Sequence, residues 1–339
     1  MIKRPVFHYN NVAGFENLLQ TETQIDIQKT QYIAVGGIYQ PKRAIVPDLP
    51  IPVLGEDYYD SLNNTQLSLF LNTILSSQLG IHLSYRNLLY KVWHDMIGFA
   101  NQHLPKPLPP AIELTLVDAI HEASQSEIVA LSGIFQKYAA YDDHLDGETF
   151  RAYYHELTKR LLISDHSSDY NDFIYQLKRV LKPSPDHPGS ANTLTSSFVL
   201  EGFSDLFDEY FVHRSSTHLL PDNKLVAFIL SDLSSFQVGP QPDMQVGDAA
   251  EMPLSKASDF IVQLFHQAFE VAAKESIERI ALRQHSINRT QSNNLRLLSR
   301  LVSKSAEGNN KHFSYLNSKD HRIKLHLLCA LPIRNSFDW

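Results

Sequence analysis

The sequence has few of the residues on which several common architectures depend. It holds a single cysteine, Cys329, so no disulfide can form within the chain and a zinc site built on cysteine pairs is excluded. Thirteen glycines are few for 339 residues, and neither GxGxxG nor GxxxxGK(S/T) occurs. Their absence argues against a Gly-rich dinucleotide-binding or P-loop architecture.

Long apolar runs are also missing. No stretch of 18 apolar residues predicts a membrane span, and the segment MIKRPVFHYNNVAGFENLL has no apolar core of the kind found in secretory signals. We therefore expect a cytoplasmic chain that does not enter a membrane.

Charge and composition narrow the class of protein further. The formal net charge is −7 and the pI is about 6.1, which argues against a general binder of nucleic acid or anionic membranes. The hydrophobic fraction of 43% is enough to build a core, and the length suits one large domain or two modest ones.

The most regular apolar pattern lies within residues 246–290. Pro253 suits a first helical turn, Ser255 or Ser258 can cap it, and no further Gly or Pro occurs before Gly308. Apolar residues then recur with a period of 3.6, which predicts one long amphipathic helix that continues to about residue 303. The stripe consists of Ile261, Phe265, Ala268, Phe269, Ala272, Ile280 and Ile287.

Helical patterns fill most of the chain, which predicts an all-α fold built as a large helical bundle. Further helices are expected at 57–79, 81–104, 111–138, 148–163, 171–181, 198–212 and 223–236. Four prolines between 41 and 52 predict an irregular N-terminal arm over residues 1–56, with one possible hairpin within 25–39. The helical domain would then span 57–339, with a loop insertion near 182–197.

Three short patches resemble the indoleamine 2,3-dioxygenase superfamily of helical haem proteins, together with its pyrrolnitrile-type branch. They are LGIHLSYRNLLYKVW (79–93), DDHLDGETFRAYYHEL (142–157) and VGDAAEMPLSKASDFIV (246–262). The resemblance covers about a third of the chain. It implies an all-α haem protein and an oxygenase-like reaction on an aromatic amino acid or indole, with haem b as the cofactor.

The resemblance also implies a substrate pocket. Its wall would be formed by Tyr85, Leu88, Leu89 and Phe150. The family's arginine, which holds the substrate carboxylate, is replaced here by His155, so the cation role would pass to Arg151, one turn earlier. The plainer interpretation makes Tyr85, Leu88 and Leu89 ordinary core, together with Trp93, and makes Arg151 a solvent-facing helix residue.

Two histidines are candidates for the axial ligand of the haem iron. The family's ligand follows a Leu-Arg pair, which matches Leu282-Arg283-Gln284-His285. On a straight helix, however, His285 falls on the polar side, whereas His266 borders the apolar stripe. The hypothesis favours His285 and keeps His266 as the alternative, although each is equally explained as a packed or solvated histidine without a ligand.

Two other functions remain open. Asp142, Asp143 and Asp146 form DDHLD, which resembles the magnesium motif of isoprenoid enzymes, but Tyr175 and Arg179 stand where the second motif needs Ser and Glu. The chain would otherwise be a non-catalytic helical interaction or accessory protein. A small aromatic substrate is the expected partner of the enzyme, and a homo-oligomer is possible.

Overall fold

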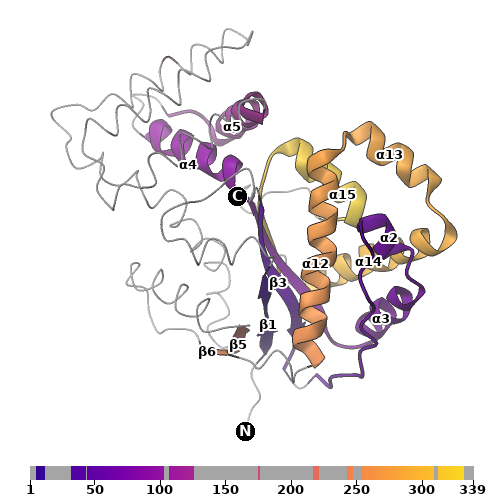
Figure 1. Cartoon of the computed structure of the whole chain (residues 1–339). Coiled ribbons are helices and arrows are strands. Elements are labelled where there is room, and N and C mark those ends of the chain that lie inside the picture. Colours follow the sequence, from indigo (N-terminus) through magenta and orange to yellow (C-terminus); the bar gives the residue numbers. More distant parts are fainter. Residues whose placement is uncertain are drawn as a thin grey trace. The chain divides into compact units, whose positions relative to one another are not determined.

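The computed structural model of the chain describes residues 5–11, 32–42, 44–102, 107–125, 175, 217–220, 243–246, 253–308 and 312–331 (Figure 1). The chain folds into two compact units. The first comprises Met1–Phe15, Ile33–Tyr85 and Ser204–Trp339, and the second comprises Glu16–Tyr32 and Arg86–Phe203. Residue 56 falls within the first unit, and the loop predicted at 182–197 lies outside the described residues.

A seven-stranded mixed sheet organises the first unit, so the all-α prediction is wrong and the chain belongs to the α/β class. The strand order is β6-β5-β1-β3-β4-β7, with β2 paired to β3. The strands are β1 (Val6–His8), β2 (Asn10–Asn11), β3 (Tyr32–Gln40), β4 (Gly80–Asn87), β5 (Thr217–Leu220), β6 (Asp243–Val246) and β7 (Phe313–Leu316).

Strand β1 lies at the centre of this order. It runs antiparallel to β3, with Phe7 opposite Tyr39, and parallel to β5, with Phe7 opposite His218. Strand β6 continues the parallel side beyond β5. The prediction of an irregular N-terminal arm is therefore wrong for the segments that form β1, β2 and the nine-residue strand β3. The Pro-rich residues 44–56 form neither helix nor strand, as predicted.

Strand β4 replaces the first half of the helix predicted at 81–104. In Ile81-His82-Leu83-Ser84-Tyr85 apolar and polar residues alternate, and a period of two places them on opposite faces of a sheet. All eight residues of β4 are buried, which explains why a helical interpretation of the same apolar content was possible. Helix α4 begins only at Leu88 and runs to Gln102.

The long helix predicted from 253 to 303 is three helices: α12 (Pro253–Lys274), α13 (Ile277–Ser286) and α14 (Arg289–Gly308). Ser276 caps α13 by accepting a hydrogen bond from the Arg279 N–H. Asn288 and Gln291 form a reciprocal capping box at the start of α14, at 2.9 and 3.0 Å. These two caps start new helices where the apolar stripe alone predicted continuity.

Helix α12 carries the main core of the first unit. Its predicted stripe is confirmed, because Ile261, Phe265, Ala268, Phe269 and Ala272 are all buried. Figure 1 shows α12 running alongside β1 and β3, with α13, α14 and α15 (Lys319–Cys329) beyond it.

A serine fixes α12 on the sheet. Ser258 Oγ accepts a hydrogen bond from the Ile38 N–H at 3.0 Å and is 2.8 Å from the Leu254 carbonyl oxygen. The contact is close because Gly37 has no side chain: a Cβ there would lie 2.3 Å from the His8 carbonyl oxygen and 2.5 Å from Ser258 Cβ. Gly37 also has a φ of +150°, which favours glycine.

Helix α14 holds the short helices α2 (Tyr58–Leu62) and α3 (Thr65–Ser76) through polar side chains. The fully buried Asn294 donates to the Leu62 and Asn64 carbonyl oxygens at 2.8 and 2.9 Å and accepts from Ser68 Oγ at 2.6 Å. At the other end, the Lys304 ammonium group donates to the carbonyl oxygens of residues 74, 75, 77 and 79. Carbonyls that α3 leaves unpaired at its C-terminus are thus satisfied.

In the second unit, α4 packs against α5 (Pro110–Gln125). Trp93 Nε1 donates to Ser124 Oγ at 2.9 Å, and the Tyr90 ring meets the His121 ring edge-on at 5.3 Å. Asn101 accepts from the Leu108 N–H at 2.5 Å and so fixes the chain just before α5. Among the helices that the structure describes, none is both long and apolar enough to cross a membrane.

The contact at Gly37 predicts a large effect of one added methyl group. Gly37→Ala should lower the free energy of unfolding by about 2–4 kcal/mol, because the Cβ meets backbone and Ser258 and the φ is strained. Urea denaturation measures this change. Gly80→Ala is the matched control, since its Cβ would meet nothing nearer than Ser305 Oγ at 3.4 Å. Equal effects of the two substitutions would contradict the role given to Gly37.

The buried amide of Asn294 predicts a second stability effect. Asn294→Ala removes three hydrogen bonds, including the one to the Leu62 carbonyl oxygen, so the free energy of unfolding should fall by about 2–3 kcal/mol. The neighbouring Asn293 is only partly buried. Asn293→Ala should lower the free energy of unfolding by well under half as much as Asn294→Ala. Thermal denaturation of both variants tests the difference.

Candidate functional site

Asn10 and Asp259 meet at the end of the central strand. Asn10 is the first residue of β2, two residues after the end of β1, and its Nδ2 donates to Asp259 Oδ1 at 3.1 Å. The two residues are 249 positions apart in the chain. Asp259 directly follows Ser258, so the bonds that seat Ser258 on β3 also place this carboxylate beside Asn10.

The Asp259 carboxylate is exposed at the surface but partly surrounded by protein. This partial burial raises the pKa of Asp259 above its ordinary value, while a hydrogen bond from Gln263, one turn further along α12, acts in the opposite direction. One carboxylate and two amides thus gather at this end of α12. Carboxylate and amide oxygens are the ligands that hard divalent cations prefer.

The directions of the neighbouring strands also favour a ligand site beside Asn10. Strands β1, β5 and β6 are parallel, and Asn10 lies at their carboxyl ends. From β1 the sheet continues through the parallel strand β5 on one side and through the antiparallel strand β3 on the other. In open α/β sheets, ligands commonly bind outside the carboxyl ends of the parallel strands.

A second cluster occupies one face of the sheet and consists of aromatic and imidazole rings. Phe7 lies at its centre: the His218 ring stacks on it at 5.3 Å, the His82 ring meets it edge-on at 5.1 Å, and the Tyr39 and His312 rings lie at 4.7 and 6.0 Å. All except Tyr39 are buried.

Burial keeps the His82 and His8 imidazoles uncharged at neutral pH, against the effect of their hydrogen bonds. His82 Nε2 donates to the His8 carbonyl oxygen at 2.9 Å, and Tyr9 Oη is 2.9 Å from His218 Nδ1. Burial, and then the neighbouring histidines, hold the pKa of His82 well below 6.5. Burial also lowers the pKa of His8 to about 4, against the effect of a hydrogen bond with Gln40.

The ring cluster is best explained as core. Within the described ranges, no group of three or more His, Cys, Asp or Glu side chains is placed to hold a metal ion. Rings in stacked and edge-on contact fill the space on this face of the sheet, as aromatic cores do.

The structure places the predicted pocket residues differently from the hypothesis. Tyr85 lies on β4 with 1% of its surface exposed; its ring packs 3.8 Å from Phe269, and its Oη is 3.0 Å from His321 Nε2. Leu88 and Leu89 begin α4 in the second unit, and Leu89 is buried. Tyr85 and Leu89 thus belong to different compact units.

The other predicted residues lie outside the described part of the chain. They are Asp142, Asp143, Asp146, Phe150, Arg151 and His155.

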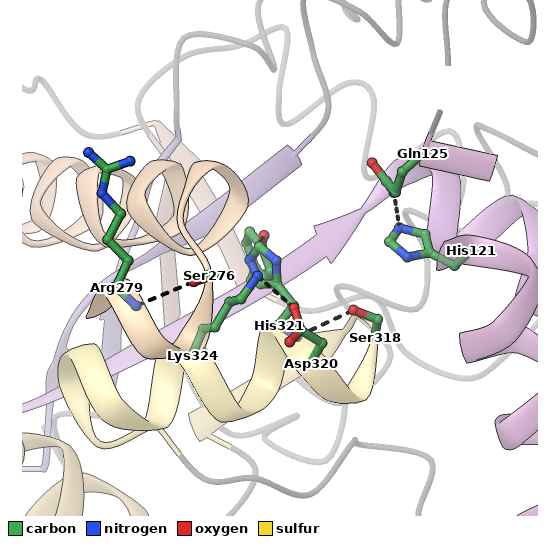
Figure 2. A network of polar contacts seen from close by, with 9 residues as sticks. His121, Gln125, Ser276, Arg279, Ser318, Asp320, His321 and Lys324 are labelled. Carbon is green, nitrogen blue, oxygen red and sulfur yellow. Dashed lines mark hydrogen bonds and ion pairs between the residues drawn. The ribbon is translucent and has the colours of Figure 1, made fainter. Parts of the chain in front are cut away.

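His321, the partner of Tyr85, sits in the first turn of α15. Figure 2 shows this helix start: Ser318 Oγ accepts a hydrogen bond from the His321 N–H at 3.3 Å, and Asp320 pairs with Lys324 at 2.6 Å. The Tyr85–His321 contact therefore joins β4 to α15 beneath α12, which makes Tyr85 a core residue of the first unit.

The two candidate haem ligands lie on different helices. His285 is exposed near the end of α13. His266 is half-buried on α12; burial lowers its pKa, while Glu270 acts to raise it. Its Nδ1 is buried and has no hydrogen-bond partner among the described residues. No described contact favours either imidazole as an iron ligand, and haem binding stays a prediction.

Sequence reasoning missed Asn10 and Asp259. The motif SKASDF was part of a patch that resembled another family, and its Asp was not considered separately. A signal was present: Asn10-Asn11 follows the short apolar-aromatic segment Val6–Tyr9, and an Asp follows a Ser in the second turn of the strongest helix. No known family model matches the chain, and no characterised protein sequence or solved structure is detectably similar to it.

The buried histidines predict that acid destabilises the fold. The folded pKa of His8, about 4, lies below its ordinary 6.5, so between these values the unfolded chain binds a proton that the folded chain does not. The free energy of unfolding should therefore fall as pH falls from 6.5 to 4, by roughly 3 kcal/mol for His8 alone. His121, whose pKa burial also lowers to about 4, acts in the same direction.

Urea denaturation between pH 7 and pH 4 measures this dependence. His8→Gln should reduce the slope of the free energy of unfolding against pH by an amount close to the uptake of one proton. This holds whatever the effect of the substitution on stability at pH 7. His285→Gln, at an exposed position, is the control and should leave the slope as it is. Identical slopes for the two variants would show that His8 does not contribute.

Proposed function

We propose that the chain binds a phosphate ester together with a divalent cation at the carboxyl end of β1, with Asp259 as the cation's carboxylate ligand. The observation that carries the proposal is the contact between Asn10 Nδ2 and Asp259 Oδ1 at 3.1 Å, formed at the carboxyl ends of the parallel strands β1, β5 and β6.

The small number of charged ligands fits one kind of cation site. Magnesium keeps several waters and is commonly held by one or two carboxylates plus the phosphate oxygens of the ligand. Such a site needs no cage of three protein ligands. The partial burial that raises the pKa of Asp259 also makes its negative charge poorly solvated, which favours contact with a cation.

Asn10 supports the site in two ways. Its Nδ2 orients the carboxylate, and its amide is of the type that coordinates hard cations through oxygen. Because Asn10 is neutral, the protein supplies one negative charge from this pair, and the phosphate ester would supply the rest. We therefore expect cation and ester to bind cooperatively.

Mn²⁺ is a paramagnetic substitute for Mg²⁺. Its binding, measured by electron paramagnetic resonance with and without a nucleoside monophosphate, tests the proposal. Mn²⁺ affinity should rise when the nucleotide is present, and Asp259→Asn should lower it by at least about tenfold, because the charged ligand is lost. Asp60→Asn, at an exposed acidic residue of α2, is the matched control. Unchanged Mn²⁺ binding by Asp259→Asn would refute the site.

Asn10→Asp separates a ligand role from a merely structural one. Without cation, two adjacent carboxylates should repel and lower the melting temperature. Added Mn²⁺ should then raise it more in Asn10→Asp than in the natural chain, because two carboxylates bind the cation more tightly. A variant that is destabilised but gains nothing from Mn²⁺ would argue that Asn10 only shapes the fold.

The haem-dependent oxygenase suggested by the family resemblance stays a prediction, as do its aromatic substrate, a homo-oligomeric state and residence in the cytoplasm. The mixed sheet removes one of its supports, since the resemblance implied an all-α fold. The absorption spectrum of protein expressed with a haem precursor tests it directly. The accessory-protein alternative would be favoured if neither haem nor a cation–nucleotide pair bound.

A further inference from the structure

Helix α14 presents a row of positive charge that the proposed site does not use. Its sequence, RTQSNNLRLLSRLVSKSAEG, contains four basic residues and a single acidic one, Glu307, near its end. Arg289, Arg296 and Arg300 are exposed, and we call them the α14 arginine stripe. The chain as a whole has a net charge of −7, so the stripe has the opposite sign to the protein that carries it.

The geometry of the helix aligns these three side chains. They are spaced by seven and four residues, close to two turns and one turn, so they point in nearly the same direction. A rise of 1.5 Å per residue separates them by about 10 and about 6 Å along the axis. The opposite side of α14 is fixed in the core by Leu298, Leu301 and Val302, which keeps the stripe facing outward.

No acidic residue neutralises the stripe within the described part of the chain. The ion pairs found there join Lys274 to Glu270, Arg283 to Glu275 and Lys324 to Asp320. Arg296 donates a hydrogen bond to the Asn293 side-chain oxygen at 3.0 Å, which leaves its charge in place.

The adjoining helix α3 has no charged residue at all. Its sequence is TQLSLFLNTILS, and it packs along α14. Leu69 projects from it with 58% of its surface exposed. The exposed Leu69 of α3 thus lies on the helix that packs against the α14 arginine stripe. Protein-binding surfaces commonly combine an apolar anchor residue with charged residues that steer the partner.

We propose that the α14 arginine stripe docks an acidic helix of a partner protein. In a partner helix that runs antiparallel to α14, carboxylates four and eleven residues after a first one would reproduce the intervals of the stripe, because both helices share the same rise per residue. Guanidinium groups bind carboxylates in a bidentate manner. Exposed Leu69 would contact an apolar residue of the same partner helix.

Nucleic acid fits this surface less well. Three cations are fewer than the six to ten phosphate contacts that typical duplex binders make. Neither α3 nor α14 offers an exposed aromatic ring on which a base could stack, since Phe70 is fully buried. The net charge of −7 would also repel a long polyanion.

The test uses the full chain and a fluorescein-labelled alanine-based helical peptide with glutamates at positions i, i+4 and i+11. Fluorescence anisotropy should show binding at low salt that weakens as salt is added. The triple variant Arg289→Gln, Arg296→Gln, Arg300→Gln should lose about tenfold in affinity, as expected for three exposed ion pairs. Glutamine keeps helix propensity, and circular dichroism should be unchanged.

A second triple variant controls for net charge. Lys256→Gln, Lys274→Gln and Arg279→Gln change exposed cations of α12 and α13 by the same three units and should leave peptide binding unaltered. Equal losses in both variants, or no binding by the natural chain at low salt, would overturn the proposal. Tighter binding of a single-stranded oligonucleotide of equal charge would overturn it in favour of nucleic acid.

Discussion

The close approach of α12 to the sheet at Gly37 is the contact on which the first unit depends. Ser258 lies where a side chain on residue 37 would otherwise stand, and it bonds the Ile38 backbone directly. This contact fixes the rotation of α12 about its axis and its distance from the sheet. The apolar stripe of α12 therefore faces the core, and Asp259 contacts Asn10. Core packing and the candidate site therefore have one cause, the absence of a side chain at a single strand position.

The sequence predicted the helices better than it predicted their ends or the sheet. The apolar face of α12 could be recognised because its 3.6-residue period is sustained over five turns. The starts of α13 and α14 were missed because the apolar stripe predicts one continuous helix, whereas the capping residues Ser276 and Asn288 begin new ones. Strand β4 was missed because its residues are buried on both faces and its apolar content also fits the helix that follows it.

The candidate site was harder to predict than the fold. Asn10 and Asp259 are 249 residues apart, and neither belongs to a motif of fixed spacing. What brings them together is the pairing of β1 with β3 and the docking of α12, and no local pattern encodes that combination. Tyr85, which the resemblance implied for a substrate pocket and the plainer interpretation for the core, is packed on Phe269.

The parallel pairing of β1 with β5 also has a consequence during synthesis. Val6 pairs with Thr217, so the central strand emerges from the ribosome long before its partner on that side exists. At about 5–20 residues per second this interval lasts on the order of 10–40 seconds. During this interval, one edge of β1 exposes unpaired backbone groups that can pair with strands of other nascent chains. A chaperone that binds the segment around β1 would therefore protect the protein during synthesis.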